Sequence, residues 1–276
     1  DFDAVDGQPV EALAVVPDGP FGADFVGRVN CGDHVDAPLV VIQHRYVGRG
    51  LRDEVEIRNH GLERRDVEVR LSVDADFQNV FDVKAGYDGG VRQHTFSTSD
   101  GGIDIVAASD ARSAVERLVL RTFPEPDLAH DEGFVSWHVD LPPGAHWTAC
   151  IELYVTADGR VIEPSLRCGM DVAHAIPVSR LRSWRNSTAR IVTALPVLGA
   201  AVNRSLDDLG ALRIFDPEHV DRVVVAAGAP WFMTLFGRDS LLTSWMALPV
   251  DHALTHGVLA ELADAQGRSV DPITEE

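Results

Sequence analysis

The sequence has little positive charge and almost no lysine. Lys84 is the single lysine, and arginine supplies the rest of the 24 basic residues, which face 43 acidic ones. The formal net charge is therefore −19. A surface this acidic repels a phosphate backbone, so the composition argues against nucleic acid as a partner. We interpret the acidity as a surface property that keeps the protein in solution.

Long apolar runs are also missing. The longest, such as LVVI and VVVAAGAPWF, fall far short of the roughly 20 residues that a helix needs to cross a membrane. The chain does not open on a basic segment followed by an apolar one, so we predict no signal peptide and no membrane partner. Because the sequence begins at Asp1 and not at a methionine, we expect that an upstream piece could be missing.

Cysteine is scarce. Cys31, Cys150 and Cys168 lie far apart and have no CxxC spacing. This pattern predicts neither a zinc site nor a disulfide framework, and it fits a reducing compartment. We therefore expect a cytoplasmic protein. The remaining composition, 45% hydrophobic and 24% charged, is that of a soluble globular chain, and 276 residues can hold one large or two ordinary domains.

The first part of the chain alternates apolar and polar residues with period 2. In DVEVRLSVDADF the apolar positions are Val67, Val69, Leu71 and Val73, and the same alternation recurs in DEVEIRN, FVSWHVDL and HWTACIELYV. Turn sequences such as NHG, YDGG, LPPGA and ADG separate these runs. Many short alternating strands predict an antiparallel β-sandwich. We place this domain at residues 1–165, with a linker at residues 166–177.

The pattern changes to helical spacing in the second part, residues 178–276. Apolar residues recur every three or four positions from Ser179 onward, and Pro196 should kink or interrupt this helix. A second helix is predicted to start at Asp239 or Ser240, both good N-caps. A third, DHALTHGVLAELADAQG, would end with Gly267 at the C′ position. Three helices with apolar faces this wide need partners, so we expect the front part of a longer helical domain.

The segment APWFMTLFGRDSLLTSWMAL, residues 229–248, sets a charged pair among aromatic rings. Arg238 and Asp239 offer a planar fork of donors and a set of acceptors, which is the equipment needed to hold a polyhydroxylated ring. Trp231, Phe232 or Phe236 could supply an apolar face for the C–H side of a sugar. The alternative is that Asp239 merely caps the helix that begins at Ser240. On spacing alone both interpretations stay open, and they are compatible.

Other motifs indicate no chemistry. His252 and His256 have i, i+4 spacing, but without a third ligand we interpret them as helix-surface histidines. GDHVD and AHDEG are expected to be solvated turns, and Trp137 and Trp147 to be sandwich core. No phosphate-binding or nucleophile motif is present, and we expect neither a metal nor an organic cofactor.

The carboxylates near the candidate site do not identify a catalytic pair. Hydrolysis of a glycoside with inversion needs an acid and a base about 6–10 Å apart. Asp239, Asp271, Glu275 and Glu276 are the carboxylates that we expect nearest to the candidate pocket, and their spacing selects no pair. The general acid and base are therefore not identified.

The segment PWFMTLFGRDSLLTSWMALP resembles bacterial glycogen-debranching or amylo-α-1,6-glucosidase-type proteins, which carry PWF-x-T-x-FGRDS. The tail LADAQGRSVDPITEE looks like the next block of that family. Upstream, RYVGRGLRDEVEIRNHGLERRDVEVRLSVDADFQNVFDVKAG is similar to its N-terminal domain through RN, ADF and FDVK-G. The similarity covers most of the chain in order.

This resemblance implies a multi-domain β plus α protein, in which the antiparallel β-sandwich is followed by the opening helices of an incomplete (α/α)6 barrel. It also implies that Arg238 and Asp239 hold the hydroxyls of a terminal glucose and are not themselves the acid and base. The catalytic carboxylates would lie on later barrel helices, beyond residue 276, so this chain alone should be inactive.

We therefore expect the N-terminal part of a glycoside hydrolase whose substrate is an α-linked glucosyl oligosaccharide or polysaccharide. The alternative is a non-catalytic carbohydrate-binding or scaffolding protein. A third possibility is a purely structural sandwich with a helical tail. The sequence determines neither the linkage nor the oligomeric state.

Overall fold

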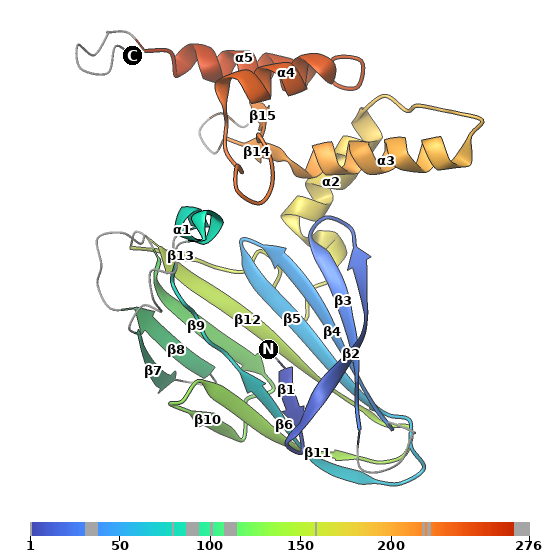
Figure 1. Cartoon of the computed structure of the whole chain (residues 1–276), viewed down its shortest axis with the longest axis vertical. Helices are drawn as coiled ribbons and strands as arrows, with labels where there is room; N and C mark the ends of the chain where they lie inside the picture. Colours follow the sequence, from blue (N-terminus) through green and yellow to red (C-terminus); the bar gives the residue numbers. More distant parts are fainter. Residues whose placement is uncertain are drawn as a thin grey trace. The chain divides into compact units, whose positions relative to one another are not determined.

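The computed structural model describes residues 2–30, 38–78, 80–86, 94–99, 102–107, 115–157, 159–216, 219 and 222–267. The chain divides into two compact units, Asp1–Val178 and Ser179–Glu276 (Figure 1). The predicted domain limits, with a sandwich to residue 165 and a linker over residues 166–177, stay predictions. Cys31, the GDHVD and YDGG segments and the carboxylates Asp271, Glu275 and Glu276 lie outside the described residues.

The first unit is built from antiparallel strands. The pairing order is β10-β11-β6-β1-β2-β3-β4-β5-β12-β9-β8-β7, with β13 beside β12. The strands are β1 (Phe2–Val5), β2 (Gln8–Asp18), β3 (Gly22–Val29), β4 (Leu39–Gly48), β5 (Gly50–Asn59), β6 (Arg65–Ser72), β7 (His94–Ser99), β8 (Gly102–Ala107), β9 (Val115–Phe123), β10 (Leu128–His130), β11 (Phe134–Leu141), β12 (His146–Ala157) and β13 (Arg160–Ile162). A short helix, α1 (Val80–Ala85), lies between β6 and β7 in the sequence.

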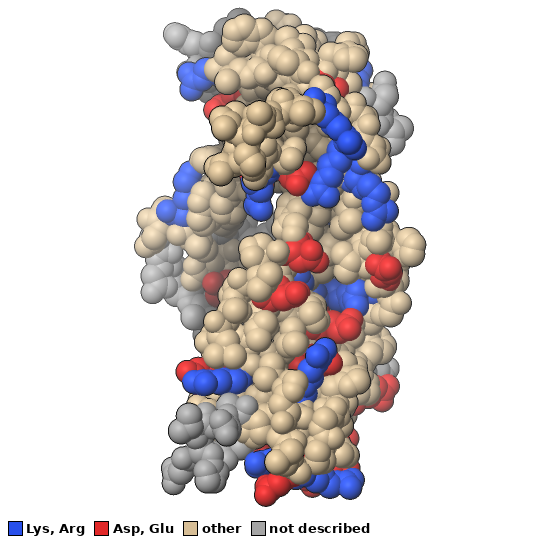
Figure 2. All heavy atoms as spheres, turned by 90° about the vertical axis from the view of Figure 1, so that its right-hand side faces the viewer, with Lys and Arg blue, Asp and Glu red and all other residues tan. Residues whose placement is uncertain are grey.

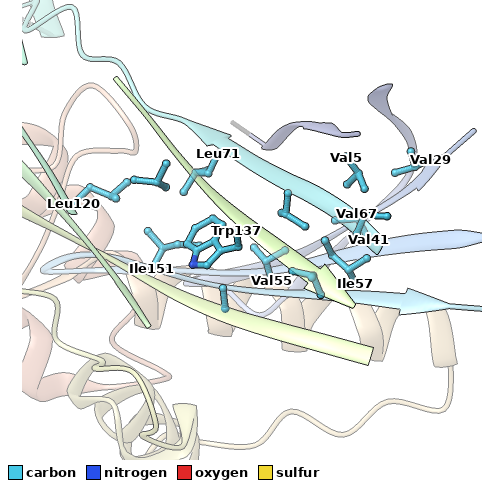
Figure 3. Packing of buried hydrophobic residues seen from close by; sticks show 14 of the residues in the cluster. Val5, Val29, Val41, Val55, Ile57, Val67, Leu71, Leu120, Trp137 and Ile151 are labelled. Atoms are coloured by element: carbon cyan, nitrogen blue, oxygen red, sulfur yellow. The ribbon is translucent and has the colours of Figure 1, made fainter. Parts of the chain in front are cut away.

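The core of this unit lies between two layers of the sheet. Side chains of β6 and β11 form one cluster with side chains of β4, β5, β8 and β12 (Figure 3). Val67, Val69 and Leu71 are all buried in β6, which confirms that the period-2 positions face inward. Trp137 is buried in this cluster and its ring lies 5.5 Å from that of Trp147. The predicted β-rich region and its two core tryptophans are therefore confirmed.

The segment after β13 returns over the outer face of the sheet. Leu166 and Ala175 are buried there against Tyr46 of β4. Gly50 has a φ of +98°, and a Cβ at this position would lie 2.9 Å from the backbone nitrogen of Pro164. Only glycine therefore fits where the β4–β5 turn meets this segment. A 3₁₀ helix, η1 (Val172–His174), follows, capped by Asp171.

The second unit contains helices and a small hairpin. Helix α2 (Ile176–Ser187) begins in the first unit, and α3 (Pro196–Ala211), α4 (Gly237–Met246) and α5 (His252–Asp264) follow. Pro196 interrupts the helical pattern, as predicted, and stands at the start of α3, where its missing N–H costs nothing. The hairpin of β14 (Arg213–Phe215) and β15 (Val223–Val225) was not predicted. Its core is formed with α4 and α5.

Two predicted helix ends are wrong. Helix α4 begins at Gly237 with Phe236 as its N-cap, and no side chain caps it, so neither Asp239 nor Ser240 is the cap. The reason is that the Ser240 hydroxyl accepts the Phe236 N–H at 3.1 Å from inside the first turn. Helix α5 ends with Ala265 as its C-cap, so Gly267 lies one position beyond C′.

The part of the helical region that the structure describes does not test barrel closure, and the incomplete (α/α)6 barrel stays a prediction. None of the helices in the described ranges has the length and apolar character needed to cross a membrane.

Candidate functional site

The five predicted sugar-binding residues lie on one continuous segment, which runs from the loop after β15 into the first turn of α4. A tight loop presents Trp231 and Phe232, because Gly228 and Phe232 exchange backbone hydrogen bonds of 3.1 and 2.8 Å. Phe236 follows as the N-cap of α4, and Arg238 and Asp239 lie in its first turn. Local chain geometry therefore places both charges at the amino end of a helix.

The structure brings two of the three aromatic rings together. The rings of Phe232 and Phe236 meet edge to face with centroids 5.6 Å apart, a favourable aromatic geometry. Both rings are about one-third exposed, and Trp231 is half-buried. These two rings, with Trp231 directly before Phe232 in the chain, therefore form the apolar part of the candidate site.

The charged pair is open to solvent. Arg238 and Asp239 are both exposed. Among the described residues, neither side chain has a hydrogen-bond or ion-pair partner. A negative side chain in the first turn of a helix is favoured by the positive end of the helix dipole. Because the cap interpretation of Asp239 is wrong, its carboxylate is available as an acceptor, and the Arg238 guanidinium is available as a donor.

Helix α4 buries its small polar side chains and exposes its large apolar ones. Ser240 and Ser244 are 0% exposed, and their hydroxyls donate to Val225 O at 2.8 Å and Leu241 O at 3.1 Å. The exposed side chains are Leu241 (37%), Leu242 (50%), Trp245 (64%) and Met246 (76%). We call these four residues the α4 apolar face. Arg238 and Asp239 lie one turn before the α4 apolar face along the same helix. Two charged side chains therefore border an exposed apolar surface.

A three-residue group of metal-ligand type lies elsewhere in the second unit. Ligand atoms of Asp216, His219 and Glu261 all fall within 4.8 Å of one another. Asp216 Oδ2 lies 2.6 Å from His219 Nδ1, and Arg222 donates to Glu261 at 3.2 Å. An arginine shares the cluster, so ion pairing already explains the geometry. Sequence reasoning missed it because the residues come from a loop and from α5, far apart in the chain.

The two histidines predicted on a helix surface are found there. His252 and His256 are exposed on α5, which confirms them as helix-surface residues. The AHDEG segment includes the end of β10 and the turn at residues 131–133 before β11, where Gly133 N donates to His130 O at 3.1 Å.

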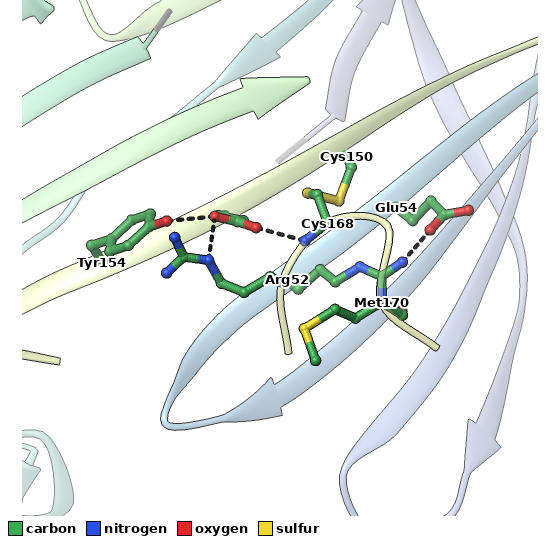
Figure 4. Close-up of a disulfide and its surroundings, with 8 residues drawn as sticks. Arg52, Glu54, Cys150, Tyr154, Cys168 and Met170 are labelled. Atoms are coloured by element: carbon green, nitrogen blue, oxygen red, sulfur yellow. Dashed lines mark hydrogen bonds and ion pairs between the residues drawn. A yellow bond between two sulfur atoms is a disulfide. The ribbon is translucent and has the colours of Figure 1, made fainter. Parts of the chain in front are cut away.

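The cysteine prediction is wrong. Cys150 and Cys168 form a disulfide with Cα atoms 5.9 Å apart (Figure 4). Cys150 points outward from β12, and the segment after β13 returns over that face, which the sequence pattern did not reveal. The cysteine argument for a reducing compartment therefore no longer holds, and the cytoplasmic location stays a prediction without that support.

Beside the disulfide, β12 carries a buried carboxylate that interrupts its alternation. Glu152 is 2% exposed. One of its oxygens accepts from Cys168 N at 2.6 Å, and the other accepts from the Tyr154 hydroxyl at 2.5 Å. Burial, followed by the bond to Glu152, raises the pKa of Tyr154 to about 12. Tyr154 therefore stays protonated and acts as a donor at neutral pH.

Acidic residues are dispersed on the one face of the molecule that Figure 2 shows. Acidic side chains on the face shown in Figure 2 lie scattered among neutral and basic ones and do not gather in one patch. This distribution agrees with the interpretation of the acidity as a general surface property.

The fold defines a two-unit protein. Its first unit is a large antiparallel β-structure, and its second unit is largely helical. A family model described as the N-terminal domain of (some) glycogen debranching enzymes matches residues 4–152. The chain belongs to this family. The resemblance proposed from the RN, ADF and FDVK-G landmarks is therefore confirmed.

Likenesses to other proteins are distant. No curated protein matches the sequence. Among solved structures, a protein assigned as a kojibiose phosphorylase, from the human microbiome, is 8% identical with a TM-score of 0.37, covering 72% of this chain and 25% of that one. An assigned aldose 1-epimerase from Escherichia coli K12 is 12% identical with a TM-score of 0.31, covering 55% of this chain and 70% of that one. A polysaccharide lyase is 11% identical with a TM-score of 0.29, covering 54% and 26%. The chain thus spans a quarter of the length of the first of these structures.

Proposed function

We propose that the chain is the N-terminal part of a glycogen-debranching-type glycoside hydrolase and that it binds an α-linked glucosyl oligosaccharide at the first turn of α4. In this proposal Arg238 and Asp239 hold sugar hydroxyls, and Trp231, Phe232 and Phe236 line the apolar side of the ring. Membership of the glycogen debranching N-terminal family over residues 4–152 supports the substrate class.

The observation that carries the proposal is the composition of α4. Its buried face holds Ser240 and Ser244, whereas the α4 apolar face is exposed, and so are Arg238 and Asp239, which have no partner among the described residues. An exposed apolar patch edged by polar groups is typical of an interaction or ligand site. A guanidinium fork beside a carboxylate supplies both donors and acceptors, as a ring of hydroxyls requires.

The proposed roles separate binding from bond cleavage. Glycoside hydrolysis needs one carboxylic acid to protonate the leaving oxygen and one carboxylate to activate water or attack the sugar. Within the described part of the candidate segment, Asp239 is the one carboxylate, so it cannot supply both roles. We assign it to binding and propose that the acid and base lie outside this sequence, on further helices of an (α/α)6 barrel.

Sugar binding tests the proposal. Panose, a glucose trisaccharide with one α-1,6 and one α-1,4 bond, is titrated into the chain up to millimolar concentration while tryptophan fluorescence is recorded. We expect saturable binding, because Trp231 is part of the site. Asp239→Asn should weaken it about tenfold or more, since hydrogen bonds to charged groups are worth about 1.5–3 kcal/mol.

Asp208→Asn is the matched control. Asp208 is exposed on α3 and pairs with Arg204 at 2.9 Å, and exposed pairs of this kind contribute about 0–1 kcal/mol. Its affinity for panose should equal that of the unchanged chain. If the chain does not bind panose, or if Asp239→Asn binds as tightly as Asp208→Asn, the site assignment is wrong.

The alternative, a carbohydrate-binding or scaffolding protein without hydrolysis, shares the binding result and differs in turnover. An in-frame genomic continuation past codon 276 that encodes helices with a carboxylate pair, and that releases glucose from a branched dextrin, would support the hydrolase. A stop codon at that point would support the non-catalytic alternative.

A further inference from the structure

A strap of nine residues, Glu163–Asp171, crosses the outer face of the sheet near β5 and β12 (Figure 4). We call this segment the strap. Its first half is anchored by apolar burial, because Pro164 is buried and Leu166 packs against Tyr46. Its second half, from Arg167 to Asp171, has largely exposed residues, with Gly169 and Met170 open to solvent. The two halves are therefore held by different forces.

The second half of the strap is held by polar contacts and by one covalent bond. Cys168 N donates to Glu152 Oε1 at 2.6 Å, and Arg52 Nη1 donates to Met170 O at 2.9 Å. Arg167 Nε lies 3.4 Å from Glu152 Oε2. The covalent bond is the disulfide between Cys168 and Cys150 of β12.

Each of the polar contacts can be replaced by water. Glu152 is 2% exposed and Arg52 is 8% exposed while the strap covers them. A buried charge is tolerated only when paired and hydrogen-bonded, and Arg52 Nε has no partner within the described structure. If the second half of the strap lifts, water reaches Glu152 and Arg52, and their solvation offsets the contacts that are lost. Such segments lie at the low end of local stability.

The disulfide is not part of the main core. The core cluster of the first unit consists of inward-facing side chains such as Val55, Trp137 and Ile151, whereas Cys150 lies on the opposite face of β12. Both cysteines are half-buried and not enclosed in the core. Breaking the bond therefore removes no apolar packing from the sandwich.

We propose that the Cys150–Cys168 disulfide is a redox-sensitive latch that keeps the second half of the strap closed over Glu152 and Arg52. Its reduction by a dithiol opens this half while the sandwich stays folded. The dithiol attacks one sulfur to give a mixed disulfide, and its second thiol displaces that sulfur. Two electrons and two protons pass to Cys150 and Cys168, and the dithiol leaves as its own disulfide.

Thiol counting establishes the state of the latch. The chain, denatured without reductant and treated with an alkylating agent, should carry one modified cysteine, Cys31, and three after reduction with dithiothreitol. Three modified cysteines without reduction would overturn the proposal. The Cys31→Ser variant should carry no modified cysteine before reduction and two after it. This result excludes disulfide exchange with the third cysteine.

Hydrogen exchange then measures the opening. In the folded chain, a peptide covering residues 167–171 should exchange at least tenfold faster after reduction, and a peptide covering Phe134–Leu141 of β11 should be unchanged. The double variant Cys150→Ser/Cys168→Ser should show the fast exchange without reductant. Equal exchange in both redox states would show that the polar contacts suffice to hold the strap. Loss of protection in both peptides together would show that the disulfide stabilises the whole first unit. Either result overturns the latch.

Discussion

Asn59, the last residue of β5, joins three stretches of chain at one end of the sandwich. Its side-chain amide donates to Glu63 O and to Leu141 O, both at 2.8 Å, and its carbonyl oxygen accepts from Gly61 N at 2.9 Å. The residue is 1% exposed. A buried amide has to be satisfied in this way. The RN landmark of the sequence therefore has a structural role that its spacing did not reveal.

Substitution of Asn59 tests that role. Asn59→Asp keeps the shape but replaces two donated hydrogen bonds with a carboxylate oxygen that faces carbonyl oxygens. We expect the first unit to lose at least about 2 kcal/mol of stability, because unsatisfied buried polar groups cost about 1–3 kcal/mol each. The measurement is the urea midpoint of the first unit by pulse proteolysis.

Asn30→Ala serves as the comparison for this measurement. Asn30 is exposed and donates to Glu11 at 3.2 Å, its one side-chain bond among the described residues, so its loss should change stability by less than about 0.5 kcal/mol. Equal midpoints for the Asn59 and Asn30 variants would mean that the Asn59 bonds do not hold this end of the sandwich.

Single residues of the candidate site show which features could be predicted from the sequence. The exposure of Arg238 and Asp239 among aromatic residues followed from their types and spacing. The start of α4 did not, because Ser240 acts from inside the helix through bonds to Phe236 N and Val225 O. The disulfide was equally hidden, since it depends on a chain return that no local pattern encodes.

At the scale of elements, α5 packs closely on β15 through Gly257. A Cβ at this position would lie 2.2 Å from Val223 O and 2.9 Å from Val223 N. Both atoms are backbone, so they can move aside only if the strand shifts. Close packing of α5 on β15 therefore requires glycine at position 257, in the middle of the helix.

Gly257→Ala is expected to destabilise the second unit. Overpacking costs about 1–3 kcal/mol, and we expect this cost to exceed the gain of about 1 kcal/mol that alanine brings in helix propensity. Pulse proteolysis of the second unit in urea measures the difference.

Gly199→Ala is the matched helical control for Gly257→Ala. A Cβ at Gly199 in α3 would meet a single side-chain atom, Thr193 Cγ2, at 3.3 Å. That end of a side chain can move by a few tenths of an ångström. Gly199→Ala should therefore be neutral or stabilising. If Gly257→Ala is as stable as Gly199→Ala, the packing account of α5 is wrong.

Elements with a strong period were predicted and those without one were missed. Strands β6 and β11 bury alternate residues in the sandwich core, so their sequences carry the period-2 signal. The hairpin of β14 and β15 has three-residue strands, too short to show a period. Its VVV run reads equally well as part of a buried helix. Length therefore limits what periodicity can decide.

At the scale of the molecule, the family match and the proposed sugar site lie in different units. The chain belongs to the glycogen debranching N-terminal family over residues 4–152, which covers most of the first unit. The candidate sugar site lies in the other unit, at the amino end of α4. The central claim of the proposal is therefore the location of the site, at the start of α4.

Hydrogen exchange with and without saturating panose tests this location most directly. The account predicts slower exchange in peptides covering residues 228–246, because bound sugar shields the loop and the first turn of α4. Peptides from the strands of Asp1–Val178 should be unchanged. Slower exchange confined to the strands, or no change in residues 228–246 at saturation, would contradict it.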